Sequence, residues 1–344
     1  MSKKIKVVDF FSGCGGTSSG FQAAGMEIIL GLDFDTSAAQ TFQLNFPKAK
    51  FVLSDIASVP TDQLPIHIDR NHEFLLFSGC APCQPFSQQN RQKEKNDPRR
   101  NLLLEFGRFV KYWQPDFVFV ENVPGLQKVK SDNGPFATFC TLLSDLGYQF
   151  DFKIFSSTVF GVPQKRERLM LMASRHNSIK FPDFSVKKLP TVRDWIGDLP
   201  KIAAGETHPI DPEHQAAKLS EINLKRLKAT PEGGNRKNWP AYLWLECHKN
   251  YSGHSDVYGR LWWDKPAATL TTKCISYSNG RYGHPEQDRA ITIREAACLQ
   301  TFPKDYKFSG SLGSKARQIG NAVPPLIAKK VGAIFLNQIR NMES

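Results

Sequence analysis

Short apolar runs alternate with helix-like segments along the first half of the chain. The runs typical of strands are, in order, IKVVDFF, MEIILGLDFD, KFVLSDI, EFLLFSG, PDFVFVENV, FDFKIFSS and RLMLMASR. Apolar strands that alternate with helices are typical of a parallel sheet covered on both faces. We therefore predict a doubly wound α/β domain over roughly the first half of the chain.

The segments between these runs carry helix signals. TSSGFQAAG is predicted to be a helix closed by Gly25, and TSAAQTFQLNF a helix capped by Thr36 or Ser37. NLLLEFGRFVKYW is predicted to be a helix, as is FATFCTLLSDLG, which Gly147 closes. Near the carboxyl end, ARQIGNAVPPLIAKKVGAIFLNQI indicates a loop followed by a helix apolar enough to pack back on the first domain.

The alternation stops after about residue 175. The stretches that follow, such as GDLPKIAAGETHPIDPEH and ATPEGGNRKNWP, are rich in proline, glycine and charge. We predict a first domain made of residues 1–175 plus about 305–344. A smaller, irregular second domain and hinge are predicted over about 176–304.

The amino-acid composition indicates which class of partner the protein binds and in which compartment it acts. The 344 residues carry a formal net charge of +12, which favours a polyanion such as nucleic acid. The segment RQKEKNDPRR, Arg91–Arg100, has five basic residues against two acidic ones, a composition that a solvated loop also shows. Seven scattered cysteines do not resemble a disulfide framework and indicate a reducing, cytoplasmic location. No apolar run approaches the roughly 20 residues of a membrane helix, so no membrane partner is expected.

Polar and glycine-rich segments follow the predicted strands directly. They are Ser12–Gly16, Asp33–Asp35, Asp55, Cys80–Ser87 and Glu121–Val123. Ligands of open α/β sheets bind at the carboxyl ends of the strands, so these segments are the candidate site.

The first of these loops, SGCGG, suits close approach of a ligand to the backbone. It does not meet the dinucleotide pattern GxGxxG, because Ser18 stands at the last position. Free amides at a helix start still suit an anionic group such as a carboxylate. Asp33, about 20 residues further on, suits the hydroxyls of a ribose. A plain tight turn and an ordinary strand-end acid remain alternatives for these two features.

The pair Cys80 and Cys83 has three interpretations. A structural zinc site needs more ligands, and there is no second CxxC motif. A redox pair is possible, although Pro85 follows the second cysteine closely. A nucleophile at a strand end, beside a basic loop that lowers the thiol pKa from about 8.5, fits better.

Glu121 and the segment QKRER hold the other candidate side chains. An acid at the end of a buried strand is costly unless it is paired or functional, so Glu121 is either a satisfied structural acid or a proton donor. Arg166 and Arg168 stand at alternate positions and are predicted to share one face. A surface salt-bridge ladder is the other interpretation of these arginines.

Together, and in this order, the motifs resemble those of the DNA (cytosine-5) methyltransferase family, in particular its bacterial modification-type enzymes. DFFSGCGGTSSGF resembles the family's S-adenosylmethionine loop, APCQPFS its nucleophile loop, ENV its glutamate motif and QKRER its Gln-x-Arg-x-Arg motif. KPAATLTTKC, ITIREAACLQTFP and RQIGNAVPP resemble its later motifs. The resemblance spans Val8 to about Gly332 and leaves out about residues 176–255, where this family keeps its variable target-recognition region.

The resemblance implies a fold, a reaction and a set of catalytic residues. The fold is a doubly wound, Rossmann-like S-adenosylmethionine-dependent methyltransferase domain with a second, smaller irregular target-recognition domain. Cys83 is then the nucleophile that adds to carbon 6 of a flipped-out cytosine, and carbon 5 is methylated. Glu121 contacts ring nitrogen 3 and the exocyclic amine, Arg166 holds the ring carbonyl oxygen, and Arg168 supports the same pocket.

The resemblance also implies an S-adenosylmethionine site that needs no metal. Asp33 holds the ribose hydroxyls and Phe34 stacks on the adenine, which Asp55 and Ile56 also meet. Cys80, where the family usually has glycine, is expected to be a bystander beside the cofactor, although it leaves open a pairing with Cys83 on oxidation. The full set expected to bind the cofactor is Phe11, Gly13, Cys14, Gly16, Asp33, Phe34, Asp55, Ile56, Pro82, Leu102, Asn321 and Val323.

The expected binding partners, and two alternative functions, follow from the same resemblance. The expected partner is double-stranded DNA, read by the segment Lys180–Tyr282, in which Arg236, Lys237 and Arg260 suit guanine edges or phosphates. A cognate restriction endonuclease is a possible further partner, and a monomer is expected because one flipped base needs one active site. The alternatives are a tRNA cytosine-5 methyltransferase and a non-catalytic DNA-binding regulatory module. The tRNA branch usually carries a Cys-Phe-Thr segment that is absent here.

Overall fold

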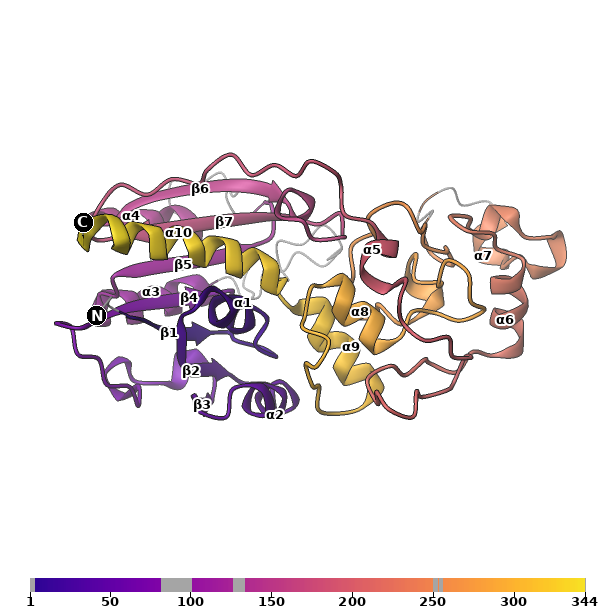
Figure 1. The fold of residues 1–344 in the computed structure, drawn as a ribbon, viewed down its shortest axis with the longest axis horizontal. Helices are drawn as coiled ribbons and strands as arrows, with labels where there is room; N and C mark the ends of the chain where they lie inside the picture. Colours follow the sequence, from indigo (N-terminus) through magenta and orange to yellow (C-terminus); the bar gives the residue numbers. More distant parts are fainter. Residues whose placement is uncertain (1–3, 82–100, 126–133, 250–252, 254–255, 344) are drawn as a thin grey trace. The chain divides into compact units, whose positions relative to one another are not determined.

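The computed structural model describes residues 4–81, 101–125, 134–249, 253 and 256–343, and the chain divides into two compact units. Unit 1 comprises Met1–Phe160, Glu167–Ser185 and Val323–Ser344, and unit 2 comprises Gly161–Arg166 and Val186–Ala322. The elements are labelled in Figure 1.

Unit 1 contains the strands and the longer helices of the predicted α/β domain. They are β1 (Lys4–Phe10), α1 (Gly16–Ala24), β2 (Glu27–Asp33), α2 (Thr36–Asn45), β3 (Lys50–Leu53), β4 (Glu73–Gly79), α3 (Leu102–Trp113), β5 (Phe117–Asn122), α4 (Pro135–Asp145), β6 (Gln149–Ser156), β7 (Glu167–Ser174) and α10 (Pro325–Glu343). The predicted strands are all present, and Gly25 closes α1 in a left-handed conformation as expected. The predicted cap of α2 is wrong, because the side chain of Asp35, rather than Thr36 or Ser37, accepts from the amides of Ser37 and Ala38.

The seven strands form one sheet in the order β3-β2-β1-β4-β5-β7-β6. Strands β1 to β5 pair in parallel, as predicted, but β7 runs antiparallel to both β5 and β6. A parallel pair needs a crossover of a dozen or more residues, usually a helix. The connection from β6 to β7, residues 157–166, is shorter than that, so the chain turns back and β7 reverses direction.

Aromatic side chains fill both faces of this sheet. On one face, Phe10 lies 5.0 Å from Phe77 and 5.2 Å from Phe106 of α3, measured between ring centroids. On the other face, Phe119 packs against Phe21 of α1, and Phe117 against Phe335 of α10. The sheet is therefore a middle layer between α3–α4 and α1–α10 (Figure 1), which holds the strand ends rigidly.

Helix α10 packs closely on α1, which confirms that the carboxyl-terminal helix returns to the first domain. A Cβ atom on Gly20 would lie 2.1 Å from the carbonyl oxygen of Pro325, so only glycine allows this approach. The segment before α10 is not a loop as predicted, because Leu312–Asn321 forms helix α9 and belongs to unit 2.

One stretch is long and apolar enough to cross a membrane by composition alone, although no such run was expected. It is Leu312–Met342, which includes α9 and α10, and 56% of its most apolar window is buried inside the structure. A helix in a protein core passes the same test, and α10 makes such a core contact with α1.

Unit 2 is irregular, and its described residues form short helices and isolated bridges rather than strands. Its α-helices are α5 (Val192–Ile196), α6 (Glu221–Lys228), α7 (Glu246–Lys249), α8 (Ile293–Leu299) and α9 (Leu312–Asn321). Residues 305–322, predicted to belong to the first domain, group with unit 2, where α9 packs on α8.

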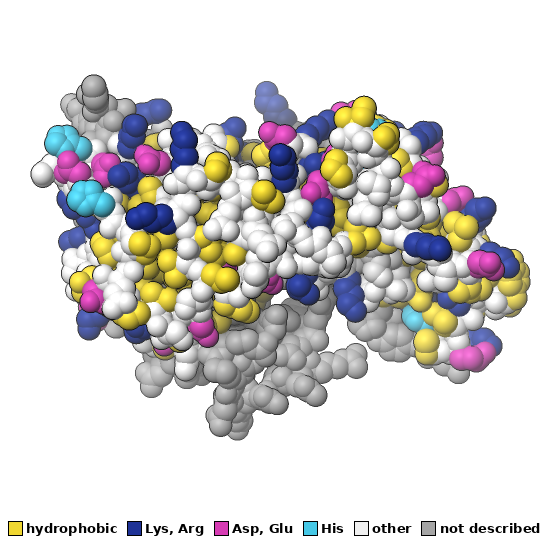
Figure 2. All heavy atoms as spheres, turned by 90° about the horizontal axis from the view of Figure 1, so that it is seen from below, with side chains coloured by type: hydrophobic (Ala, Val, Ile, Leu, Met, Phe, Trp, Pro, Cys, Tyr) yellow, Lys and Arg dark blue, Asp and Glu magenta, His cyan; other side chains and the backbone are white. Residues whose placement is uncertain are grey.

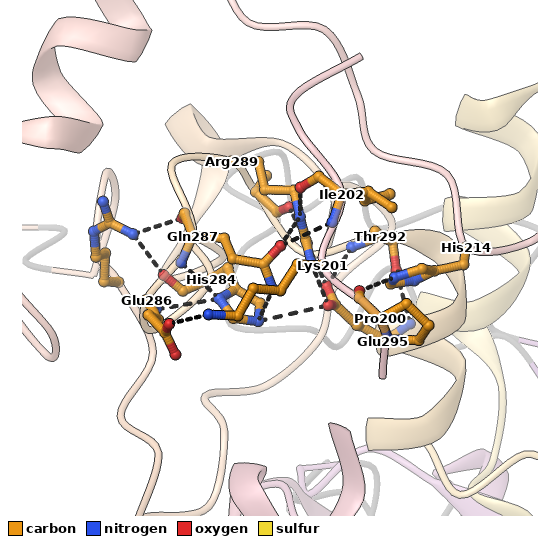
Figure 3. Close-up of polar contacts among 12 residues, drawn as sticks. Pro200, Lys201, Ile202, His214, His284, Glu286, Gln287, Arg289, Thr292 and Glu295 are labelled. Atoms are coloured by element: carbon orange, nitrogen blue, oxygen red, sulfur yellow. Dashed lines mark hydrogen bonds and ion pairs between the residues drawn. The ribbon is translucent and has the colours of Figure 1, made fainter. Parts of the chain in front are cut away.

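A buried polar network connects the segments of unit 2 (Figure 3). Both guanidinium nitrogens Nη1 and Nη2 of Arg289 donate to the carboxylate of Glu295, at 2.7 Å each, and both side chains are fully buried. Nδ1 of His284 accepts from the amides of Glu286 and Gln287, and burial lowers the pKa of His284 to about 4. The imidazole therefore stays neutral and holds the turn next to the ion pair.

Candidate active site

The loop after β1 is shaped by three residues in left-handed backbone conformations. Phe11 has φ +54°, Gly13 +51° and Gly15 +84°, and α1 begins at Gly16. A Cβ atom on Gly13 would meet nothing within 4 Å, so the backbone of this loop is open on that side. The loop therefore leaves room for a ligand beside the first turn of α1.

Asp33, at the end of β2, connects this loop to the next one. Its carboxylate accepts from the amide of Gly13 at 2.8 Å and from the amide of Asp35 at 2.9 Å. Burial raises the pKa of Asp33 above its ordinary value. The neighbouring Phe34 leaves 68% of its surface exposed, which is unusual for a phenyl ring and suits stacking on a flat ligand.

Asp55, Ile56 and Leu102 lie along the same edge of the sheet. The carboxylate of Asp55 accepts from the amide of Ala57 at 3.0 Å and starts a short helical turn. Ile56 is 2% exposed, and Leu102, the first residue of α3, packs half-buried against the same core. These three residues and the first two loops all follow strands of the parallel part of the sheet.

Two cysteines near these loops are protonated thiols. Cys14 is buried, and desolvation raises its pKa to about 12. The Sγ atom of Cys80 lies 3.6 Å from the hydroxyl of Thr17, and desolvation raises the pKa of this thiol well above its ordinary value. Neither is a ready nucleophile. Cys83 and Pro82 lie outside the described residues, as does the basic segment Arg91–Arg100.

Glu121, the acid at the end of β5, is paired. Its carboxylate lies 2.8 Å from Nε of Arg168 on the neighbouring strand β7, and the two side chains are 10% and 15% exposed. The antiparallel register, which places Asn122 opposite Leu169, brings Arg168 to this position. The arrangement presents a carboxylate and a guanidinium together at the edge of the sheet.

Asn122 is a site residue that sequence reasoning missed. Its Nδ2 atom donates to the carbonyl oxygen of Ala81 at 3.2 Å, and its Oδ1 atom accepts from the amide of Val123 at 2.8 Å. Ala81 is the last described residue before Pro82 and Cys83. Asn122 therefore fixes the start of the cysteine loop to the strand that carries Glu121. The signal in the sequence was the side-chain amide of Asn122, which stands at the end of a buried strand within the motif ENV.

Asp9 is a second missed residue. It lies on β1, fully buried, and accepts from the hydroxyl of Ser18 on α1 at 2.6 Å. Burial raises its pKa to about 6. An acid inside an apolar strand, VVDFF, was the available signal. The bond to Ser18 ties the first turns of α1 to the strand below it.

The two arginines of QKRER make different contacts in the structure. Arg166 belongs to unit 2, where its Nη1 atom donates to the carbonyl oxygens of Leu270 at 3.2 Å and Gly320 at 2.9 Å. Arg168 belongs to unit 1 and pairs with Glu121. Arg168 thus lies beside Glu121 at the strand end, and Nη1 of Arg166 contacts backbone carbonyls of unit 2.

The last two predicted cofactor residues also fall in different units. Asn321 is exposed at the end of α9 in unit 2, next to the Gly320 carbonyl that Arg166 holds. Val323 is buried in unit 1, directly before α10. The described contacts thus tie Arg166 to the Asn321 segment of unit 2.

Two of the predicted base readers are buried structural arginines. The guanidinium of Arg260 donates to four backbone carbonyl oxygens and to Asp288. Arg236 is 2% exposed and donates to the carbonyl oxygen of Gly253. Lys237 is exposed. Burial disfavours base reading by Arg236 in this conformation, and Arg260 is also buried with all its guanidinium donors in use.

Charged side chains on the surface are mixed in sign. On the face shown in Figure 2, Lys and Arg side chains of the described residues are interspersed with Asp and Glu side chains. On this face, the described Lys and Arg side chains do not form a single basic stripe.

Comparison with known proteins gives a family and relatives. A family model described as C-5 cytosine-specific DNA methylase matches residues 5–336. The chain is 40% identical over 334 residues to the Type II methylase M.HgiDII of Herpetosiphon aurantiacus, over 94% of this chain and 93% of that protein. It is 34% identical to the Type II methyltransferase M1.HphI of Haemophilus parahaemolyticus, over 98% and 88% of the two chains.

Solved structures agree on the fold. A prophage-encoded Escherichia coli protein described as a DNA modification methyltransferase superposes with a TM-score of 0.75 at 24% identity, over 98% of this chain and 100% of that one. The methyltransferase EhMeth of Entamoeba histolytica superposes with a TM-score of 0.68 at 18% identity, over 98% and 99% of the chains.

Proposed function

The chain belongs to the C-5 cytosine-specific DNA methylases and transfers a methyl group from S-adenosylmethionine to carbon 5 of cytosine in DNA; from this premise we propose that it acts through a covalent Cys83 adduct on a base flipped out of one short duplex sequence. The observation that carries the proposal is the ion pair between Glu121 and Arg168, because Glu121 lies on β5, the strand whose Asn122 bonds to Ala81 at the start of the Cys83 loop.

The proposed reaction first activates carbon 5 of cytosine for methylation. Carbon 5 of cytosine is too electron-poor to attack a methyl donor unaided. Addition of the Cys83 thiolate to carbon 6 forms a sulfur–carbon bond and makes carbon 5 nucleophilic. After methylation, loss of the carbon-5 proton and elimination of Cys83 release the product. These atoms are inaccessible inside a duplex, so the base is flipped out.

Glu121 and Arg168 act on the ring of the flipped base. Glu121 contacts ring nitrogen 3 and the exocyclic amine and offsets the charge that develops during addition. We assign the ring carbonyl oxygen to Arg168, in place of Arg166, because the guanidinium of Arg168 lies beside Glu121. Arg166 then supports the site indirectly, through the Gly320–Asn321 segment.

The described residues fit a cofactor site at the strand ends. The loop is open at Gly13, the carboxylate of Asp33 suits ribose hydroxyls, and the exposed ring of Phe34 suits the adenine. S-adenosylmethionine, when bound there, supplies the methyl group. The proposed cofactor residues are Phe11, Gly13, Cys14, Gly16, Asp33, Phe34, Asp55, Ile56, Pro82, Leu102, Asn321 and Val323.

We assign target recognition to unit 2. Its loops are irregular and are connected by a buried polar network, which suits contact with a groove of duplex DNA. Lys237 is an exposed cation that is available for such a contact. The basic segment Arg91–Arg100 is proposed to close over the flipped base, with phosphate contacts that make binding salt-dependent.

Further proposals concern assembly and compartment. The enzyme acts as a monomer, because one flipped base needs one active site. Its partner is a restriction endonuclease that recognises the same DNA sequence. The names of the relatives, Type II methylase and Type II methyltransferase, support this modification role. The six described cysteines are all free thiols, which supports a reducing cytoplasm. The family match favours DNA over tRNA and an enzyme over a regulatory module.

A trapping experiment tests the proposal. Labelled S-adenosylmethionine and unmethylated DNA first identify the modified cytosine by sequencing. A duplex carrying 5-fluorocytosine at that position is then expected to form a stable covalent complex, because fluorine does not leave carbon 5 as a proton does. The Cys83→Ser variant is expected to lose the complex, and Cys80→Ser, the matched control, to keep it. A complex that survives Cys83→Ser overturns the assignment of the nucleophile.

A further inference from the structure

Unit 2 contains a cavity of about 590 Å³ that none of the proposed roles uses. All of its lining residues belong to unit 2. They come from three segments: the residues that lead into α6, the segment Thr272–Ser278, and the start of α9. A volume of this size accommodates a group as large as a nucleotide.

The charge of the lining has one sign. Lys218, Lys273 and Arg317 line the cavity, whereas no Asp or Glu does. All three cations are exposed, and none of them forms an ion pair with any residue that the structure describes. Lys315, two residues before Arg317 on the same helix, instead pairs with Glu213 at 2.8 Å. The cavity therefore gathers cations that the protein itself does not neutralise.

Polar donors surround these cations. The first residues of two helices lie in the lining: Ser220 caps α6 and Ser311 caps α9, so both positive helix ends face the same space. A Cβ atom on Gly313, in the first turn of α9, would meet nothing within 4 Å, so the backbone is open there. Thr272, Ser276 and Ser278 also line the cavity, and the hydroxyls of Ser276 and Ser278 donate to Oδ1 of Asn279.

Part of the wall is apolar. Leu219, Ile275 and Ala316 contribute to it, and Tyr277 lies at 1% exposure with its hydroxyl bonded to Thr230 at 2.8 Å. A wall of this kind offers a surface to the carbon atoms of a sugar, while the cations and amides face an anion. The combination suits a sugar–phosphate unit better than a free carboxylate or a metal.

We propose that this cavity binds a backbone phosphate of the DNA substrate, with the adjoining sugar against the apolar wall. The proposal rests on the assignment of target recognition to unit 2. Lys273 and Arg317 carry the phosphate contact and fix the duplex in register, and they do not touch the reacting base. A free nucleotide shares this chemistry, so the test separates the two sources.

The salt dependence of DNA binding tests the site. Affinity is measured by fluorescence anisotropy between about 50 and 300 mM KCl with a duplex that the wild type methylates. Each phosphate contact contributes about 0.9 to the slope of log affinity against log salt. The double variant Lys273→Gln/Arg317→Gln is expected to lower the slope by about 0.9 to 1.8, and Lys273→Arg to keep the wild-type slope.

The control removes the same charge elsewhere on unit 2. Lys225→Gln/Lys228→Gln changes two exposed lysines of α6 that do not line the cavity, and it is expected to leave the slope close to that of the wild type. Equal slopes for the cavity pair and the control pair overturn the proposal. Because the substituted side chains are exposed, both double variants are expected to keep the wild-type Tm.

Two further readouts separate the possible failures. Saturable binding of inorganic phosphate or a deoxynucleoside monophosphate, lost in the cavity variant while the DNA slope stays unchanged, assigns the cavity to a free nucleotide and overturns DNA as the source. If the wild type binds duplex DNA but methylates none, the proposed function is contradicted, and the slope comparison is then made with the duplex that the wild type binds. A wild type that methylates, with equal slopes in both variants, overturns the cavity assignment alone.

Discussion

The Nε atom of Arg168 lies 2.8 Å from a carboxylate oxygen of Glu121, so β7 brings a guanidinium to the acid at the end of β5. The two residues are far apart in the sequence and meet only because β7 runs antiparallel to β5. Both side chains are largely shielded from solvent, and a charge-assisted contact in such a place is stronger than the same contact in water. An ion pair thus joins Glu121 to β7 before any base arrives.

Arg168→Lys tests this relationship. Lysine keeps the charge but lacks the planar fork, so it cannot hold Glu121 and a ring oxygen together. The rate of methyl transfer under saturating DNA and cofactor is expected to fall by about 10²- to 10³-fold. Arg166→Lys is the comparison: it is expected to lower the Tm, because two carbonyls lose a donor, and to change the rate less than tenfold. A larger rate loss in Arg166→Lys than in Arg168→Lys contradicts the assignment.

Asp33→Asn tests the cofactor site. The amide oxygen of asparagine still accepts from Gly13 or Asp35, but its NH2 group replaces one carboxylate oxygen that suits a ribose hydroxyl. Affinity for S-adenosylmethionine, measured by isothermal titration, is expected to weaken by about tenfold or more, since a charged hydrogen bond contributes about 1.5–3 kcal/mol. Glu27→Gln, at the exposed opposite end of β2, is the control and is expected to bind as the wild type does. Unchanged affinity in Asp33→Asn counts against the site.

Asp9 predicts a pH dependence of stability. Its pKa is about 6 in the folded protein and 3.8 as an ordinary carboxyl group, so the folded state binds the proton more tightly. The stability that this group contributes is complete below about pH 3.8 and is lost as the pH rises through about 6. Relative to Asp9→Asn, the wild type is expected to lose on the order of 3 kcal/mol between pH 3.8 and pH 7. Denaturant unfolding of both proteins at several pH values measures this, and a constant difference would refute it.

Glu295→Gln tests the buried network of unit 2. The Arg289 guanidinium, acting against the burial that favours the protonated acid, keeps the pKa of Glu295 below its ordinary value. Neutralising Glu295 leaves a buried cation without its partner, which is expected to cost about 3–5 kcal/mol. Glu286→Gln breaks the exposed pair with Lys201 in the same cluster and is expected to change the stability much less, because solvent screens this pair (Figure 3). Thermal unfolding of the two variants is the measurement, and equal shifts contradict the difference in burial.

The chain itself determined the elements and the motifs of the site. Each strand was visible as a local apolar run, and Asp33, Asp55 and Glu121 were located by their place directly after such runs. Local patterns are sufficient here because a strand of a parallel sheet is buried along its whole length, and its carboxyl end lies at the ligand edge whatever its neighbours are.

Only the tertiary structure decided how these elements are used. The direction of β7, and hence the choice of Arg168 over Arg166 as the partner of Glu121, depends on which strands pair over long range. The hydrogen bonds of Arg260 go to carbonyl groups of two other segments, residues 227–230 and 284–287, so its basic side chain alone could not show that it is structural. The sequence by itself determines which side chains are available at each strand end; the packing of distant segments decides which of them are left free to meet a substrate.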